Sequence, residues 1–243
     1  MYNLLRFKIG LIILLALYGP AASAQVFNAK EQYRIEKEYQ PFYFGLSLGY
    51  ASTAFHPTKH PAFLLSDSIL VAEPNNAPGY SLRLLATARL SDRWEIRVNP
   101  GLILGVDRSF TYHLGSKQLW EEPIVTQKIQ SNIATIPLSF KFKSDRIGNF
   151  RVYALAGVKY DFDLASNADA RNAEEMVKLK KSDYGAELGV GFNFYLPFVT
   201  VSPELKFSNG LGNVHARDPQ LKYSSVFDRL NSRMMFFTIH LEQ

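Results

Sequence analysis

The sequence predicts an all-β protein, an eight-stranded antiparallel transmembrane β-barrel of the outer-membrane type. Three observations lead to this prediction. Segments of about ten residues that alternate between apolar and polar side chains recur eight times along the 243-residue chain. Short turns and long loops alternate between these segments, and a secretory signal pattern precedes them. Each segment is about as long as a tilted strand needs to be to cross a bilayer.

The first 24 residues have the pattern of a cleaved signal peptide. Arg6 and Lys8 precede the apolar run IGLIILLALYG, and Ala22-Ser23-Ala24 supplies the small residues that a signal peptidase reads. A membrane anchor is the alternative, but the run is well short of the ~20 residues of a spanning helix. We therefore expect residues 25–41 to form a periplasmic N-terminal segment, as a tether or a disordered lead-in, and 42–243 to form the barrel.

The first four predicted strands place apolar residues on one face and small or charged residues on the other. The third of them, WEIRVNPGLILGVD, is apolar at every second residue from Trp94 to Val106, while Glu95 and Arg97 lie between. The apolar face is expected to contact lipid and the charged face to line the lumen. The four strands are Phe42–Ala54, Gly79–Leu90, Trp94–Asp107 and Gln127–Lys143.

The last four predicted strands repeat the alternation. In the fifth strand, FRVYALAGVKYDFD, Arg151 and Lys159 face the lumen, while every second residue from Phe150 onward faces lipid. In the strand at the C-terminus, Thr238, His240 and Glu242 lie opposite an apolar face. The four strands are Phe150–Asp163, Asp183–Phe194, Val199–Phe207 and Met235–Glu242.

The connections between these segments support a barrel in the outer membrane. Short turns at 91–93, 144–149 and 196–197 alternate with long loops, as in outer-membrane barrels whose long loops are extracellular and whose turns are periplasmic. A soluble β-sandwich also alternates apolar and polar residues. The strand length, the signal peptide and aromatic residues at strand ends favour the membrane barrel. The long loops are expected near 55–78, 108–126, 164–182 and 209–229.

Charged residues on the lumen face are expected to pair across the barrel. An eight-stranded barrel is wide enough only for its own side chains or one small ligand, and unpaired charges inside it would be costly. We expect Arg83 and Arg97 to pair with Glu187 and Glu204. These charges could form a proton or ion path, but a polar plug that closes the barrel is the interpretation we favour.

The sequence contains no recognisable catalytic, cofactor-binding or metal-binding pattern. Cysteine is absent, and the five histidines have no spacing that suggests a nucleophile or a metal site. His56 and His60 are four residues apart, but Pro57 and Pro61 disfavour a helix there. Basic residues are spread along the chain rather than clustered, so nucleic acid is not an expected partner. We expect a protein that is not an enzyme, with no cofactor, in the outer membrane of a Gram-negative cell.

Three stretches carry a resemblance to a known family. They are FYFGLSLGYASTAFH, PGYSLRLLATARLSDRWEIRVNPGLILGVDRSFTYHL and IPLSFKFKSDRIGNFRVYALAGVKYDFDLAS. Together they resemble the PorT family of outer-membrane β-barrels of Bacteroidota. The resemblance departs at NIATIPLSFKFK, where a more acidic approach to the Pro-Leu pair would be expected, and after Asn209, where little matches.

The resemblance implies a function in protein export. It indicates a non-enzymatic component of the type IX secretion system, which exports proteins that carry a C-terminal signal domain and supports gliding motility in some relatives. Expected partners are other outer-membrane or periplasmic components of that system, together with outer-membrane lipid. A small structural or adhesion barrel with ligand-binding loops is the alternative. Phe110, Tyr112 and Trp120 are candidate partner-facing loop aromatics, or alternatively residues of the membrane interface.

Overall fold

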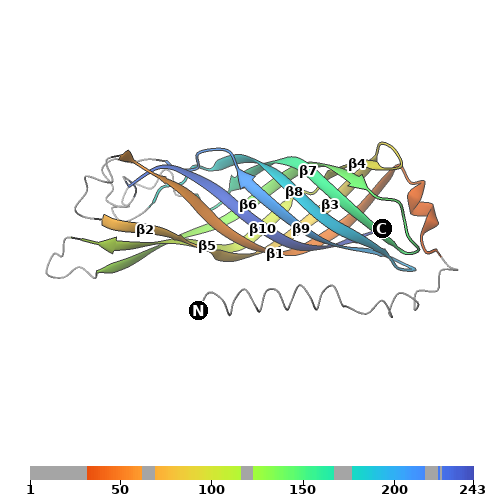
Figure 1. Cartoon of the computed structure of the whole chain (residues 1–243), viewed down its shortest axis with the longest axis horizontal. Coiled ribbons are helices and arrows are strands. Elements are labelled where there is room, and N and C mark those ends of the chain that lie inside the picture. The colour runs from red at the N-terminus through yellow and green to blue at the C-terminus, as the bar shows by residue number, and fades with distance from the viewer. Residues whose placement is uncertain (1–31, 62–68, 116–122, 167–176, 217–223, 225) are drawn as a thin grey trace, which may run out of the picture. The chain divides into compact units, whose positions relative to one another are not determined.

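The computed structural model describes residues 32–61, 69–115, 123–166, 177–216, 224 and 226–243 (Figure 1). The chain divides into two compact units, Met1–Gln32 and Tyr33–Gln243. The predicted signal peptide, residues 1–24, lies outside the described residues, and its cleavage stays a prediction that N-terminal sequencing of the mature protein tests. Within the described part of the chain, no helix is long and apolar enough to cross a membrane.

The second unit is a single antiparallel sheet closed into a ring (Figure 1). β1 pairs with β10 on one side and with β3 on the other, which closes the barrel. A short 3-10 helix, η2 (Ile35–Glu38), precedes the first strand. The strands are β1 (Phe42–Lys59), β2 (Ile69–Asn75), β3 (Ala77–Arg89), β4 (Trp94–Val98), β5 (Gly101–Leu114), β6 (Ile124–Lys143), β7 (Phe150–Asp163), β8 (Ser182–Tyr195), β9 (Thr200–Gly210) and β10 (Phe227–Glu242).

The ten strands make eight crossings, which confirms the predicted barrel. β4 and β5 form one crossing, because both lie between β3 and β6 and are separated only by Asn99 and Pro100. Proline has no N–H to donate to a ladder, which explains the interruption. β2 and β3 form another crossing, interrupted at Asn76. We call the end of the barrel with the short turns, near Phe42, the turn end, and the opposite end the loop end.

An apolar belt surrounds the turn-end half of the barrel, as expected for a surface that contacts lipid. Outward residues such as Leu46, Leu138 and Leu188 are exposed in the isolated chain. Aromatic residues border the belt on both sides, where membrane interfaces attract them. Near the turn end Trp94 packs on Phe142 at 5.0 Å and Phe150 on Phe194 at 5.2 Å, and toward the loop end Tyr50 packs on Tyr80 at 6.2 Å.

A positive charge on this belt is expected to destabilise the barrel. Leu138 faces outward on β6 between the two aromatic borders. The substitution Leu138→Arg should reduce the free energy of unfolding by about 2–4 kcal/mol in lipid. Urea unfolding in phospholipid vesicles measures this change. Gln130→Arg, at an outward position of the same strand beyond the belt, should have little effect, and equal effects of the two variants would contradict the assigned belt.

Beyond the belt, the barrel continues with the opposite arrangement of polarity. Outward residues at the loop end are polar, as at Ser109, Thr111 and Lys128. The interior is an apolar core that contains residues of several strands and connections, namely Phe55, Ile69, Ala72, Phe110, Tyr112, Leu114, Ile129, Val177, Leu179, Val214, Val226, Phe227 and Leu230. The loop end therefore has the polarity of a small soluble barrel, polar outside and apolar inside, and it continues directly from the membrane barrel.

Segments predicted as loops form part of the barrel wall at the loop end. β1, β5, β6 and β10 all extend beyond their predicted ends. The N–H of Lys180 donates to the carbonyl of Val214 at 2.8 Å, and the N–H of Val214 donates to the carbonyl of Leu230 at 3.0 Å. Parts of the predicted long loops thus continue the barrel, either as extensions of the strands or, at Leu179 and His215, through an isolated β-bridge. The connection between β7 and β8 keeps the predicted length, and the other long connections are shorter than expected.

A β-bulge in β5 explains why two predicted loop aromatics are inside the barrel. The pairing of β5 with β6 shifts between Ile103 and Val106, around Gly105, whose φ is 70°. One extra residue inverts the inward and outward positions that follow it. Val106, expected to face lipid, is therefore fully buried, and Phe110 and Tyr112 are also fully buried.

The assignment of Phe110 and Tyr112 to a partner-facing loop is therefore wrong. The position of a bulge is not evident from the sequence, so the alternation before Gly105 cannot be continued through it, and the inverted residues that follow resemble the start of a loop. The third residue of the predicted set, Trp120, lies outside the described part of the chain.

The bulge is expected to depend on the glycine. A side chain at Gly105 would meet no heavy atom within 4 Å, so the cost of a substitution comes from its left-handed backbone alone. Gly105→Ala should lower the free energy of unfolding by about 1–2 kcal/mol. Urea unfolding tests this value. Gly101→Ala is not a matched control because it is crowded by β3, whereas Ser109→Ala, at a regular position of the same strand, should change stability little.

Candidate functional site

The turn-end half of the lumen contains a buried network of charged side chains. Arg97 of β4 is at its centre, and its two terminal nitrogens donate to Glu204 of β9 and to Glu242 of β10, each at 2.9 Å. Tyr153 donates its hydroxyl to Glu204 at 2.9 Å, and His240 lies 3.2 Å from the same carboxylate. These side chains come from four strands, and they meet because each occupies an inward position of its strand.

A second carboxylate, Glu95, organises the part of the network nearest the turns. Lys143 donates to Glu95 at 2.5 Å, and Tyr43 donates its hydroxyl to the other oxygen at 2.7 Å. Lys141 lies 3.5 Å from Glu95 and 3.9 Å from Glu242, and so connects the two halves. Paired charges of this kind satisfy one another in a lumen where isolated charges would be strongly destabilising.

The segment before the first strand closes the turn end. Lys37 of η2 reaches into the lumen and donates to Glu242 at 2.8 Å. Arg34 donates to the carbonyls of Glu242 and Phe198, and Glu38 accepts from Arg146 at 3.1 Å. Burial lowers the pKa of Lys37, while the nearby Glu242 carboxylate opposes this shift. Residues 33–39 are thus an ordered cap rather than a free lead-in.

Two of the predicted lumen charges meet and two do not. Arg97 and Glu204 form the ion pair described above. Glu187 pairs instead with Lys206 at 2.9 Å, on the adjacent strand. Arg83 is buried with its guanidinium 4.3 Å from the ring of Phe236, and the described residues include no ion pair to it. Alternation predicted that all four side chains face inward, but it could not predict which cation meets which anion.

Several members of the network were not among the predicted site residues. Glu242, Lys141 and His240 lie on the inward face by the same alternation, and that signal was available in the sequence. Tyr43 and Tyr153 are harder to predict from the sequence. Tyrosine is common on the lipid-facing side of a barrel, so a tyrosine at an inward position looks like an interruption of the alternation rather than a residue of the lumen. The contribution of Lys37 could not be predicted, because it precedes the alternating region.

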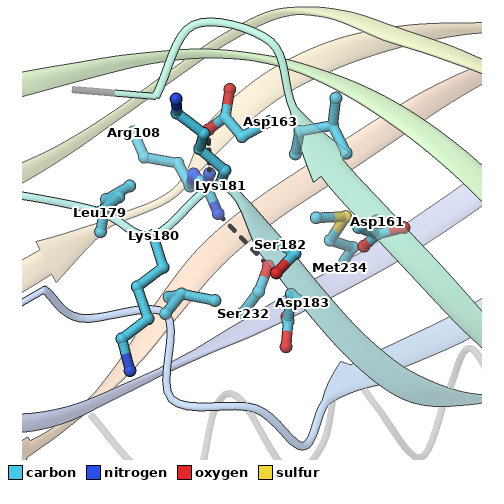
Figure 2. Close-up of a pocket in the computed structure, with 12 residues that line it drawn as sticks. Arg108, Asp161, Asp163, Leu179, Lys180, Lys181, Ser182, Asp183, Ser232 and Met234 are labelled. Atoms are coloured by element: carbon cyan, nitrogen blue, oxygen red, sulfur yellow. Dashed lines mark hydrogen bonds and ion pairs between the residues drawn. The ribbon is translucent and has the colours of Figure 1, made fainter. Parts of the chain in front are cut away.

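A small pocket lies among a further group of charged side chains, which includes Arg108, Asp161 and Asp183. It is lined by residues of β5, β7 and β10 and by the segment 179–183 (Figure 2). Arg108 donates to Ser232 at 3.3 Å and lies 4.0 Å from Asp163, as the dashed lines in Figure 2 show. Asp161 and Asp183 are directly opposite each other on β7 and β8, and Asp161 accepts from Lys159.

Side chains fill most of the lumen. The hollow between the cap and Glu95 has room for about one water molecule, and the ion pairs and apolar core fill the levels above it. Among the described residues, no group of three or more His, Cys, Asp or Glu side chains could hold a metal ion. Ion pairs and apolar side chains thus occupy most of the lumen in the part of the chain that the structure describes.

Residues 23–216 of the chain match a family model for the outer membrane protein β-barrel domain. The chain belongs to this family. Its place is therefore the outer membrane of a Gram-negative cell, as predicted. No functionally curated protein matches the sequence.

Solved structures of small outer-membrane barrels are similar to this family member. Neisserial surface protein A is 11% identical, with a TM-score of 0.41, over 82% of this chain and 96% of that one. Ail of Yersinia pestis, solved in complex with a heparin analogue, is 10% identical, with a TM-score of 0.38, over 84% and 100% of the two chains. OprG of Pseudomonas aeruginosa is 15% identical, with a TM-score of 0.37, over 82% and 93%.

Proposed function

We propose that this outer-membrane protein is a sealed structural barrel that acts by docking to other molecules rather than by transport through its lumen or by catalysis. The observation that carries the proposal is the continuous filling of the barrel. The cap at Lys37, the ion pairs of Arg97 and the apolar core around Phe110 occupy successive levels. An eight-stranded barrel leaves no further room for a channel.

Conductance measurements test this proposal. The purified protein, inserted into a planar lipid bilayer, is expected to show no steady single-channel current in salt solution. A variant with both Lys37→Ala and Arg97→Ala lacks two large side chains of the cap and the network. It serves as the control, because a leak current through this variant shows that inserted protein can be detected in the bilayer. A stable current through the unaltered protein would overturn the proposal of a sealed barrel.

The projecting loop end supports a role in binding a ligand at the cell surface. Its polar outer wall and packed apolar core extend beyond the membrane belt, and loops of such barrels lie outside the cell. This is the function of a small structural or adhesion barrel. Deletion of the gene should then reduce attachment of the cells to a surface or ligand without changing the secreted proteins.

The resemblance to the PorT family supports a second candidate, an accessory role in the type IX secretion system. In this setting the sealed barrel would dock to other outer-membrane or periplasmic components of the export machine, in contact with outer-membrane lipid. Proteomics of the medium after gene deletion distinguishes the two candidates. Accumulation of proteins with the C-terminal export domain in the periplasm would support the secretion role, and normal export would overturn it.

A further inference from the structure

The lipid-facing wall of the barrel contains a hollow over β7. Its floor includes two small outward side chains of that strand, Ala154 and Ala156, which lie among larger ones. Ala156 is paired with Phe140 of β6 and with Leu188 of β8. Its neighbour on the same face, Ala154, is paired with Phe142 of β6. The hollow has a volume of about 570 Å³, which is within the range of small-molecule sites.

The lining of the hollow is apolar. Leu205 and Phe207 of β9 line it on the side away from β6, and Trp94 of β4 lines it on the other side. One charged residue, Lys206, borders the hollow, but its amine donates to Glu187 inside the lumen at 2.9 Å. The described lining therefore presents no charge to an occupant. This composition favours a hydrocarbon chain over a polypeptide segment, whose backbone groups would lack partners there.

The hollow lies in the half of the belt nearer the turn end. Along β7, Ala154 is closer to Phe150, at the turn-end aromatic border, than to Tyr160. The short turns of outer-membrane barrels face the periplasm. Phospholipids form the periplasmic leaflet of an outer membrane, whereas lipopolysaccharide forms the outer leaflet. An acyl chain that enters the hollow from the turn end therefore belongs to a phospholipid.

Charged side chains of both signs lie at the turn-end rim of the hollow, next to Trp94 in the sequence and in the adjoining turn. Arg93 pairs with Asp145 at 3.1 Å, and Arg89 pairs with Asp92 at 2.7 Å. Both carboxylates are largely exposed. Exposed pairs of this kind contribute little to stability, so one partner can be exchanged for a ligand. Two guanidinium groups beside two carboxylates complement a headgroup that carries a phosphate and a protonated amine.

We propose that the hollow and its rim form a binding site for one phospholipid of the periplasmic leaflet whose headgroup carries a primary amine. One acyl chain occupies the floor of the hollow, the phosphate accepts from the guanidinium of Arg93, and the ammonium group donates to Asp92 or Asp145. Trp94 lies between the two parts of the site, at the interface where an indole ring is favourable. This inference goes beyond the general lipid contact of the belt, because it assigns one class of lipid to one position. It does not depend on either proposed function.

Fluorescence quenching in vesicles tests the proposal. The chain contains two tryptophans, so Trp120→Phe leaves Trp94 as the single fluorophore. This protein is reconstituted in phosphatidylcholine, and a small fraction of the lipid carries bromine on its acyl chains, which quenches a tryptophan that it contacts. Brominated phosphatidylethanolamine is expected to quench Trp94 about threefold more than brominated phosphatidylcholine at the same mole fraction, because only a primary ammonium group donates hydrogen bonds to the carboxylates. Equal quenching by the two lipids would overturn the proposal.

Matched variants locate the site. Ala156→Phe fills the hollow and should abolish the difference between the two lipids, whereas Ala86→Phe, at an outward position of β3 that does not line the hollow, should preserve it. Asp92→Asn combined with Asp145→Asn removes both carboxylates and should also abolish the difference. Asp107→Asn, which changes an exposed carboxylate on the other side of the belt, should preserve it.

A folding control keeps the test decisive. Heat-modifiable migration in gels shows whether each variant barrel folds. If Ala156→Phe does not fold, the exposed substitutions at Asp92 and Asp145 decide the test alone. A preference for phosphatidylethanolamine that remains after the hollow is filled, or after both carboxylates are removed, would overturn the proposal.

Discussion

The substitution Arg97→Met is expected to cause one of the largest losses of stability in this barrel, about 3–5 kcal/mol in the free energy of unfolding. Arg97 is almost completely buried and pairs with Glu204 and Glu242. Methionine fills much of the same volume but leaves two carboxylates with less compensation in a closed lumen. Urea unfolding in phospholipid vesicles, followed by tryptophan fluorescence, measures the change.

Exposed ion pairs provide the control for this experiment. Arg93 and Asp145 lie 3.1 Å apart at the turn end, with both side chains more than half exposed. Arg93→Met should therefore cost less than about 1 kcal/mol. If Arg97→Met were as mild as this control, the lumen would contain enough water to screen its charges, and the proposal of a sealed barrel would be wrong.

Phe110→Ala is expected to have a similarly large effect, about 3–5 kcal/mol, because it removes a fully buried ring from the apolar core. The ring of Phe110 lies 5.6 Å from that of Phe55 and 4.7 Å from that of Phe227, so its loss leaves a cavity between aromatic neighbours. The same unfolding measurement tests this value, and loop-end protease sensitivity should increase in parallel.

The neighbouring outward residue separates a core role from a docking role. Thr111→Ala changes the outer surface of the same strand and should leave stability nearly unchanged. If Phe110→Ala folded with unaltered stability but lost a binding partner, the aromatic ring would be a docking residue after all. The buried position of the ring predicts the opposite result.

The stability of the barrel therefore depends on two different interiors. In the membrane half, the lumen is held together by ion pairs that satisfy one another while lipid covers the apolar outer wall. In the projecting half, apolar burial drives the packing as in a soluble protein, since water covers the polar outer wall. The exchange of polarity occurs near Gly105, where the pairing of β5 with β6 shifts.

The class of fold, the number of crossings and the faces of most strands can be predicted from the sequence alone. Alternation with a period of two is a local property of the chain, so it can be read without knowledge of any distant contact. It therefore predicted that Arg83, Arg97, Glu187 and Glu204 face the lumen. It failed beyond Gly105, because one inserted residue inverts the faces and a bulge has no clear local signal.

Which residues meet inside the barrel cannot be predicted from the sequence and follows from the closed fold. Pairing across the lumen depends on the stagger between strands that are far apart in sequence, and that stagger brought Arg97 to Glu242 and Glu187 to Lys206. The cap at Lys37 likewise depends on how the ring closes. A local pattern determines the direction of a side chain, whereas the closed geometry of the sheet determines its partner.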